Sequence, residues 1–203
     1  VIGIFSASLR PAAEVSRRTQ ELNSAELIAD DLLETVRSKV ETATDYIKCY
    51  DNGTDVTNKT GSSEGSAIEF GYETEQGYNA AELLTADGCG PTKIVIADKD
   101  SGEQPRVEKG YLVERYYKDG YSQDADGNPI ARAMTKTYAE GFYMGLRAGL
   151  HFKIDEAKHT VTATVTIYRD KDLTDKIYSD SLIIDLRYDI PVKTEVTATK
   201  KPA

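Results

Sequence analysis

The sequence lacks tryptophan, has only two cysteines and two histidines, and contains no apolar run of about 18 residues. The missing run excludes a complete transmembrane helix within this chain. Because the cysteines form no CxxC pair and histidine is scarce, we expect no zinc site. P-loop, dinucleotide-binding and nucleophile motifs are also lacking. The sequence therefore predicts no enzyme, with no catalytic, cofactor-binding or metal-binding residues.

Basic residues are in the minority, with 25 Lys and Arg against 34 Asp and Glu, for a net charge of -9. This acidic balance favours solubility and argues against nucleic acid as a direct partner. A secretory signal peptide needs a basic start and a small-residue cleavage site, and the first residues show neither. The chain also does not begin with Met. We therefore expect a processed or truncated chain.

One apolar stripe with helical spacing runs through the first quarter of the chain. It recurs every seven residues, at Val15, Leu22, Ala29, Val36 and Ala43. No Gly or Pro interrupts residues 12–50, and Asp51 to Gly53 supply a stop signal. We expect a stem helix over residues 1–50, about 70 Å long, which the remaining residues cannot cover completely. The side chains expected to form its core with a sheet are Leu32, Val36, Val40 and Ile47.

Residues 1–9 are apolar on nearly every side of the predicted helix, and residues 1–11 are expected to be its membrane or filament-core end. The residues expected to pack in a membrane or against other protein are Val1, Ile2, Ile4, Phe5, Leu9 and Pro11. Pro11 stands where the apolar segment gives way to charge, and a kink is expected there. Arg10, Arg17 and Arg18 follow closely, at positions suited to lipid headgroups. The opening segment is thus predicted to be the end of a longer membrane helix.

The rest of the chain changes to a two-residue period. Residues 51–92 are predicted to be a variable loop region, 93–192 an antiparallel sheet, and 193–203 a flexible tail. Lys118 to Gly120 are expected to end one strand, and the last three strands to form a meander. Within that meander, Arg147, His151 and Lys153 are expected on the solvent face. The order of a helix followed by strands predicts an α+β fold, with the long helix packed on an antiparallel sheet.

Three further groups of residues are candidates for chemistry. Cys49 and Cys89 are either two thiols or one disulfide, which would suit an extracytoplasmic protein. His151 and His159 flank one predicted hairpin, and solvated histidines are favoured over a site there. The Asp124–Asn128 segment has its Gly at the wrong position for a calcium loop, so a simple turn is favoured.

The succession of an apolar helix end, a proline, a long amphipathic continuation, a loop and a closing sheet resembles the type IV pilin and pseudopilin family. The stretch LRPAAEVSRRTQELNSAELIADDLLETVRSKV is similar to the stem helix of such proteins, particularly those of Gram-positive bacteria. The stretch YMGLRAGLHFKIDEAKHTVTATVTIYRDKDLTDKIYSDSLIIDL looks like their closing sheet. The family's leader peptide, methylated first residue and helix glutamate would all lie before Val1.

The resemblance implies a structural subunit of a type IV pilus or pilus-like filament. Its helix would hold the subunit in the cytoplasmic membrane, then pack against other pilin subunits when the assembly machinery moves it to the cell surface. The resemblance does not decide whether the subunit is a major pilin, a minor pilin, or a pseudopilin of secretion or DNA uptake. The alternative is a membrane-tethered, adhesin-like domain that binds a ligand without forming a filament.

Overall fold

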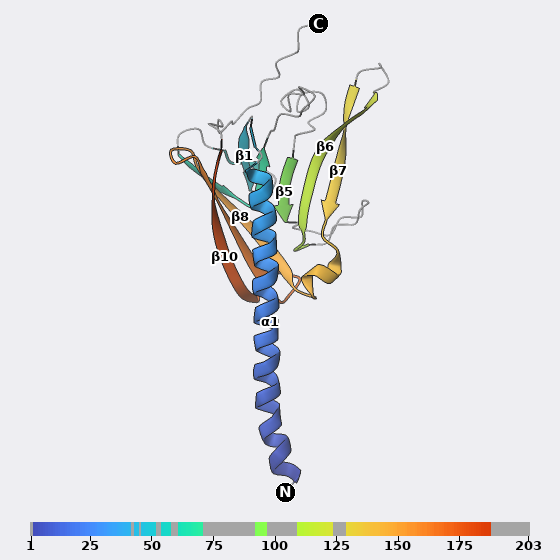
Figure 1. The fold of residues 1–203 in the computed structure, drawn as a ribbon, viewed down its shortest axis with the longest axis vertical. Coiled ribbons are helices and arrows are strands. Elements are labelled where there is room, and N and C mark those ends of the chain that lie inside the picture. Colours follow the sequence, from blue (N-terminus) through green and yellow to red (C-terminus); the bar gives the residue numbers. More distant parts are fainter. Residues whose placement is uncertain are drawn as a thin grey trace.

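The computed structural model describes residues 2–41, 43–44, 46–51, 54–57, 61–70, 92–96, 109–123 and 129–187. One N-terminal helix and two antiparallel sheets make up this part of the chain, so the fold is α+β as predicted. Figure 1 shows the helix running along the head formed by the sheets and projecting far below it.

The first half of the described elements comprises α1 (Ile2–Val40), β1 (Ile47–Asp51), β2 (Thr54–Asp55), β3 (Ser62–Gly65), β4 (Ala67–Phe70) and β5 (Thr92–Ile96). The second half comprises β6 (Leu112–Gln123), β7 (Pro129–Thr137), the 3-10 helix η1 (Glu140–Tyr143), β8 (Arg147–Asp155), β9 (Thr160–Tyr168) and β10 (Lys176–Asp185).

Helix α1 has 39 residues and is therefore about 58 Å long. Its last turn carries Arg37 and Lys39, whose positive charges interact favourably with the negative end of the helix dipole. The prediction of a helix to residue 50 was wrong, because α1 ends at Val40 and Ile47 begins a strand. Ala43 lies seven residues after Val36, Ile47 lies seven residues after Val40, and both are buried. The spacing alone therefore did not mark the end of the helix. Pairing of β1 with β4 decides the local structure there.

The four-stranded sheet has the order β10-β9-β8-β3. Its first three strands form the predicted meander, with Leu150 opposite Val165 and Ala163 opposite Leu182. Their inward side chains alternate with polar ones, and Val161, Ala163, Val165 and Ile167 of β9 are fully buried. On the solvent face, the Thr164 hydroxyl lies 2.8 Å from that of Ser181. The prediction of one apolar and one polar face is confirmed for this sheet.

The six-stranded sheet has the order β2-β1-β4-β5-β6-β7. Three of its strands, together with β3, lie within or at the end of residues 51–92, so the prediction of a loop region there was too simple. Lys118 to Gly120 do not end a strand, because β6 continues to Gln123 through a register irregularity between Lys118 and Ser122. Such a bulge absorbs turn-forming residues within a paired strand.

A corner after Gly65 joins the two sheets. Strand β3 belongs to the four-stranded sheet, and β4 begins in the six-stranded sheet after a single intervening residue, Ser66. A Cβ atom on Gly65 would lie 2.3 Å from the carbonyl oxygen of Tyr50. Glycine is therefore required where the chain crosses closely over β1.

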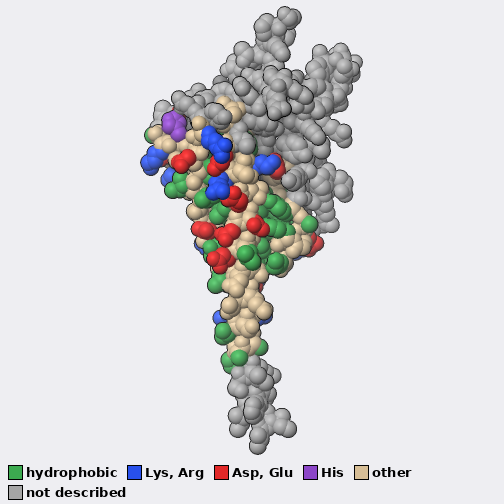
Figure 2. All heavy atoms as spheres, in the orientation of Figure 1, with side chains coloured by type: hydrophobic (Ala, Val, Ile, Leu, Met, Phe, Trp, Pro, Cys, Tyr) green, Lys and Arg blue, Asp and Glu red, His purple; other side chains and the backbone are tan. Residues whose placement is uncertain are grey.

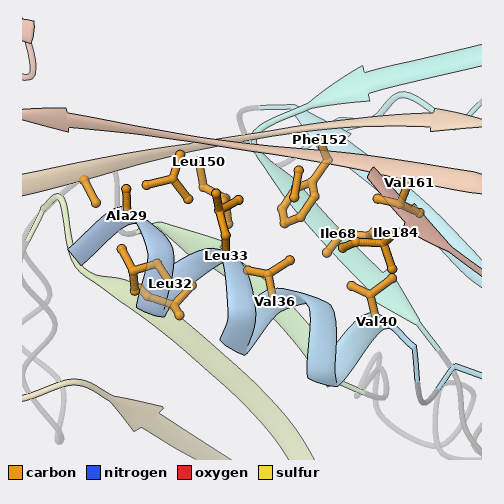
Figure 3. Close-up of a cluster of buried hydrophobic side chains, with 14 of the residues drawn as sticks. Ala29, Leu32, Leu33, Val36, Val40, Ile68, Leu150, Phe152, Val161 and Ile184 are labelled. Atoms are coloured by element: carbon orange, nitrogen blue, oxygen red, sulfur yellow. The ribbon is translucent and has the colours of Figure 1, made fainter. Parts of the chain in front are cut away.

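The hydrophobic core lies between the C-terminal half of α1 and both sheets. Figure 3 shows Leu33, Val36 and Val40 of the helix directed at Phe152, Ile68 and Ile184. The predicted core residues are all confirmed as buried, with relative exposures of 1% for Leu32 and 0% for Val36, Val40 and Ile47. Burial of such side chains stabilises by roughly 1.5–3 kcal/mol each, which is what fixes the helix on the head.

Candidate functional site

The N-terminal half of α1 projects beyond the head. We call residues 2–20 the arm, which is about 29 Å long at 1.5 Å per residue. All side chains from residue 11 to residue 20 are exposed, and the first fully buried one is Ala25. Figure 1 shows the arm standing clear of the strands, as the sequence predicted for a helix longer than its head.

The predicted packing residues all belong to this arm or lie just before it. Ile2, Ile4, Phe5 and Leu9 are in α1, but their side chains, like all of Val1, lie outside what the structure describes. Pro11 is exposed, and the helix continues through it without a break. The role of these residues in packing stays a prediction, as does a kink at Pro11.

The arm carries both apolar and charged side chains on its described part. Val15 is 65% exposed and Leu22, just beyond the arm, is 45% exposed. Arg18 pairs with Glu14 at 2.7 Å, whereas Arg17 makes no ion pair with any residue in the described ranges. Exposed pairs of this kind contribute only a few tenths of a kcal/mol to the free energy of unfolding. Because so weak a pair is easily broken, it does not keep these side chains from contacting a partner.

A clamp formed by Arg169 fixes the base of the arm. Its guanidinium donates to both carboxylate oxygens of Glu21, at 2.8 and 3.1 Å, and also to Asp175. The hydrogen bonds from Arg169 lower the pKa of Glu21, and the two carboxylates raise the pKa of Arg169. Sequence reasoning missed this clamp, since Glu21 and Arg169 are 148 positions apart and no local pattern connects them.

The β9–β10 turn that carries the clamp is itself well held. The Asp170 carboxylate accepts hydrogen bonds from the backbone N–H groups of Thr174 and Asp175, at 2.9 and 2.8 Å. The Thr174 hydroxyl also donates to it, and together these bonds lower the pKa of Asp170 to about 2. Side-chain capping of this kind fixes a turn whose Leu173 has a left-handed φ of 63°.

The upper part of α1 is tied to the six-stranded sheet as well. Lys39 forms a salt bridge of 2.9 Å with Glu114 of β6, and the hydroxyls of Thr35 and Tyr138 lie 2.5 Å apart. Glu41 accepts from Arg187 at 2.7 Å. The helix is thus anchored on several sides above Glu21, while the arm below it has no such support among the described residues.

Arg147 corrects one sequence prediction. It was expected on the solvent face of β8, but it is only 4% exposed. Its guanidinium lies 4.3 Å from the centre of the Tyr111 ring and donates to the Tyr111 hydroxyl. Tyr111 in turn stacks on Tyr143 at 4.2 Å, and the Tyr143 hydroxyl accepts from the Leu112 N–H. Burial raises the pKa of Tyr143. This cluster joins β6 to β8, and stacking of the guanidinium on the Tyr111 ring lowers the free-energy cost of burying its charge.

The remaining candidates do not gather into a site. His151 and Lys153 are exposed on β8 as predicted, and His159 lies in the β8–β9 turn. Within the described ranges no group of three or more His, Cys, Asp or Glu residues is placed to hold a metal ion. Cys49 is buried in β1, and its disulfide to Cys89 stays a prediction because Cys89 lies outside the described residues, as do 124–128 and 193–203.

Two further findings bear on the arm. No helix in the described part of the chain has both the length and the apolar character needed to cross a bilayer. A scan against models of known protein families found no match, and searches of curated proteins and of solved structures also found none. The function must therefore be argued from the arm and the head themselves.

Proposed function

We propose that this protein is the structural subunit of a pilus-like filament, of the type IV pilus or pseudopilus kind, assembled through its N-terminal helix. The observation that carries the proposal is the arm: about 29 Å of α-helix outside the head, with exposed side chains from residue 11 to residue 20 and an apolar sequence at its beginning. An isolated surface helix gains little stability from its own propensity, so a long one without packing favours a partner.

The rigid attachment of the arm supports the same role. Above Glu21 one side of the helix is buried in the core, and the Arg169 clamp lies at the boundary. A subunit built this way transmits the position of its helix directly to its head. Helices packed together by their arms would therefore present the heads in a regular array on the outside.

The proposal places the protein at the cell surface, with the apolar helix end in the cytoplasmic membrane before assembly. The membrane interior and the centre of a helical filament both remove the same apolar surface from water, so transfer between them costs little. Other pilin subunits and an assembly machinery are the partners this requires. The role needs no catalytic residue and no cofactor.

A tethered ligand-binding domain is the second candidate. The solvent face of the four-stranded sheet favours it, because the hydroxyls of Thr164 and Thr166 pair there with those of Ser181 and Ser179. In that case the arm is only a stalk, and the head acts without neighbours.

The test compares the full chain with a variant carrying Ile2→Ser, Ile4→Ser and Phe5→Ser. A matched control carries Ser6→Asn and Ser8→Asn, which leave the apolar residues of the same segment in place. Sedimentation velocity over a range of concentrations measures association, and electron microscopy shows the form of the assemblies. We expect the wild type and the control to form elongated assemblies and the triple variant to stay monomeric. A wild type that stays monomeric at every concentration, or a triple variant that assembles equally well, contradicts the proposal.

A further inference from the structure

A second, exposed stripe runs along α1 on the side away from the core. Its residues follow the alternating spacing of four and three that keeps side chains on one side of a helix. They are Ala13, Arg17, Gln20, Ser24, Leu27, Asp31, Glu34 and Ser38. All are exposed except Ser24, which is half-buried. The side chains that enter the core, by contrast, include Ala25, Leu32 and Val36 on the opposite side of the helix. We call the exposed set the outer stripe.

The two ends of the outer stripe differ in charge. Within the stripe, the arm carries Arg17, whereas the upper part carries Asp31 and Glu34. Glu34 forms a salt bridge with Arg37 on the same helix. Figure 2 shows acidic side chains gathered over the part of the helix that lies along the lower head. Asp31 on this acidic part, like Arg17 on the arm, makes no ion pair with a residue in the described ranges. Both side chains are exposed and thus accessible to a second molecule, and Arg17 also interacts electrostatically with Glu21.

The positions of these residues match after a shift of two heptads. Ala13 corresponds to Leu27, Arg17 to Asp31, and Gln20 to Glu34. In a parallel pair of helices shifted by that amount, about 21 Å, Arg17 of one lies beside Asp31 of the other. The small Ala13 then leaves room for Leu27, which is 62% exposed in the single chain. Apolar contact and charge complementarity thus favour the same alignment.

We propose that the outer stripe is the contact between neighbouring copies of this chain, with parallel helices shifted by two heptads. This rests on the proposed function and adds to it the pairing of the arm of one copy with the acidic section of the next. Because the stripe faces away from the core, the two heads lie on opposite sides of the paired helices and do not compete for the same space. The charge pattern also disfavours an unshifted pair, in which Asp31 would face Asp31.

Disulfide trapping tests the alignment. Ala13→Cys and Leu27→Cys are placed in separate full-length chains of different tag size, each in a Cys89→Ser background, while Cys49 is buried in the head. A disulfide requires Cα atoms within about 7 Å, so a mixed Ala13–Leu27 link forms only when the copies are shifted as proposed. Val15→Cys replaces Ala13→Cys as the control, because Val15 is exposed on another side of the helix.

We expect the mixed Ala13–Leu27 link to exceed both the same-site links and the Val15 control. Arg17→Glu in the Ala13→Cys chain should lower the yield of this link roughly two- to fivefold at low salt, and adding Asp31→Arg to the Leu27→Cys chain should restore it. If the chain associates through its apolar end but this link does not exceed the control, the alignment is wrong and the proposed function stands. If sedimentation finds only monomer, the proposed function fails first. Binding of Arg17 to anionic vesicles, with no rescue by Asp31→Arg, assigns the arginine to lipid instead and overturns the inference.

Discussion

The guanidinium of Arg169 holds the carboxylate of Glu21 with two hydrogen bonds, at 2.8 and 3.1 Å, at the level where α1 leaves the head. This contact joins the first helix to the turn before the last strand. It divides the helix into a fixed upper part and an arm with exposed side chains. The buried core fixes the helix on the head, and this pair, which the fold brings together from distant parts of the sequence, adds a polar contact at the boundary of the arm.

Replacing Arg169 with Gln should return the pKa of Glu21 toward its usual 4.5, because the hydrogen bonds from Arg169 are the main cause of its lowering. A carboxyl whose pKa is lower in the folded than in the unfolded protein stabilises the fold at a pH above its unfolded-state pKa. This contribution is lost as the pH falls through the folded-state pKa. The clamp should thus open in acid, below pH 4.5. An NMR titration of the Glu21 carboxyl measures the shift. Lys171→Gln, in the same turn, is the control, and an unshifted Glu21 in wild type would contradict the clamp.

Replacing Gly65 with Ala should destabilise the protein by about 1–3 kcal/mol or more. The added Cβ would meet the Tyr50 carbonyl oxygen at 2.3 Å, and backbone cannot move aside as a flexible side chain can. Urea unfolding measures the loss. Gly141→Ala is the matched control, since a Cβ there has nothing within 4 Å, and it should change stability by less than about 0.5 kcal/mol. Equal effects of the two substitutions would refute the close crossing at the sheet corner.

Replacing Leu32 with Ala should cost about 2–5 kcal/mol, because the side chain is 1% exposed between the helix and the sheets. Leu27→Ala removes the same atoms from a side chain that is 62% exposed on the same helix. In dilute solution it should cost less than about 0.5 kcal/mol. Denaturant melts of the two variants give the comparison. A loss below about 1 kcal/mol for Leu32→Ala would rule out the packing of α1 on the head.

Replacing Tyr143 with Phe should cost roughly 1–3 kcal/mol, since the hydroxyl accepts a buried hydrogen bond of 2.7 Å from the Leu112 N–H. The ring itself stays stacked on Tyr111, so the variant isolates the hydroxyl. Tyr178→Phe serves for comparison, because Tyr178 is only half-buried and its hydroxyl makes no hydrogen bond within the described ranges. Thermal unfolding that gives the same small change for both would show that the buried bond contributes nothing.

The sequence predicted well the features that have a long, regular period. The stripe through Leu32 and Val36 located the buried side of the helix, and the alternation around Val165 located the final hairpins. In both cases many residues repeat one pattern, so single exceptions do not matter. The projection of the arm followed from length alone, because a helix of this size exceeds what the remaining residues can cover.

Features that depend on distant partners could not be predicted in this way. Ile47 fits the helical spacing but pairs with Phe70 in a strand, and nothing in the local sequence indicates that pairing. Arg147 alternates with inward side chains, yet it is buried because Tyr111 offers its ring and hydroxyl. The contact of Arg169 with Glu21 belongs to the same class. Tertiary contacts override local preference at each of these positions.

Amide hydrogen exchange before and after assembly tests the central claim most directly. In the dilute full chain, exchange should be fast in residues 2–20 and slow in β8 and β9, because only the latter are buried in a core. The account predicts that assembly at high concentration slows exchange in the arm by at least about tenfold and leaves the strands unchanged. If the arm continues to exchange rapidly while new protection appears on the Thr and Ser face of β9 and β10, the molecules associate through their heads, and the helix is not the assembly surface.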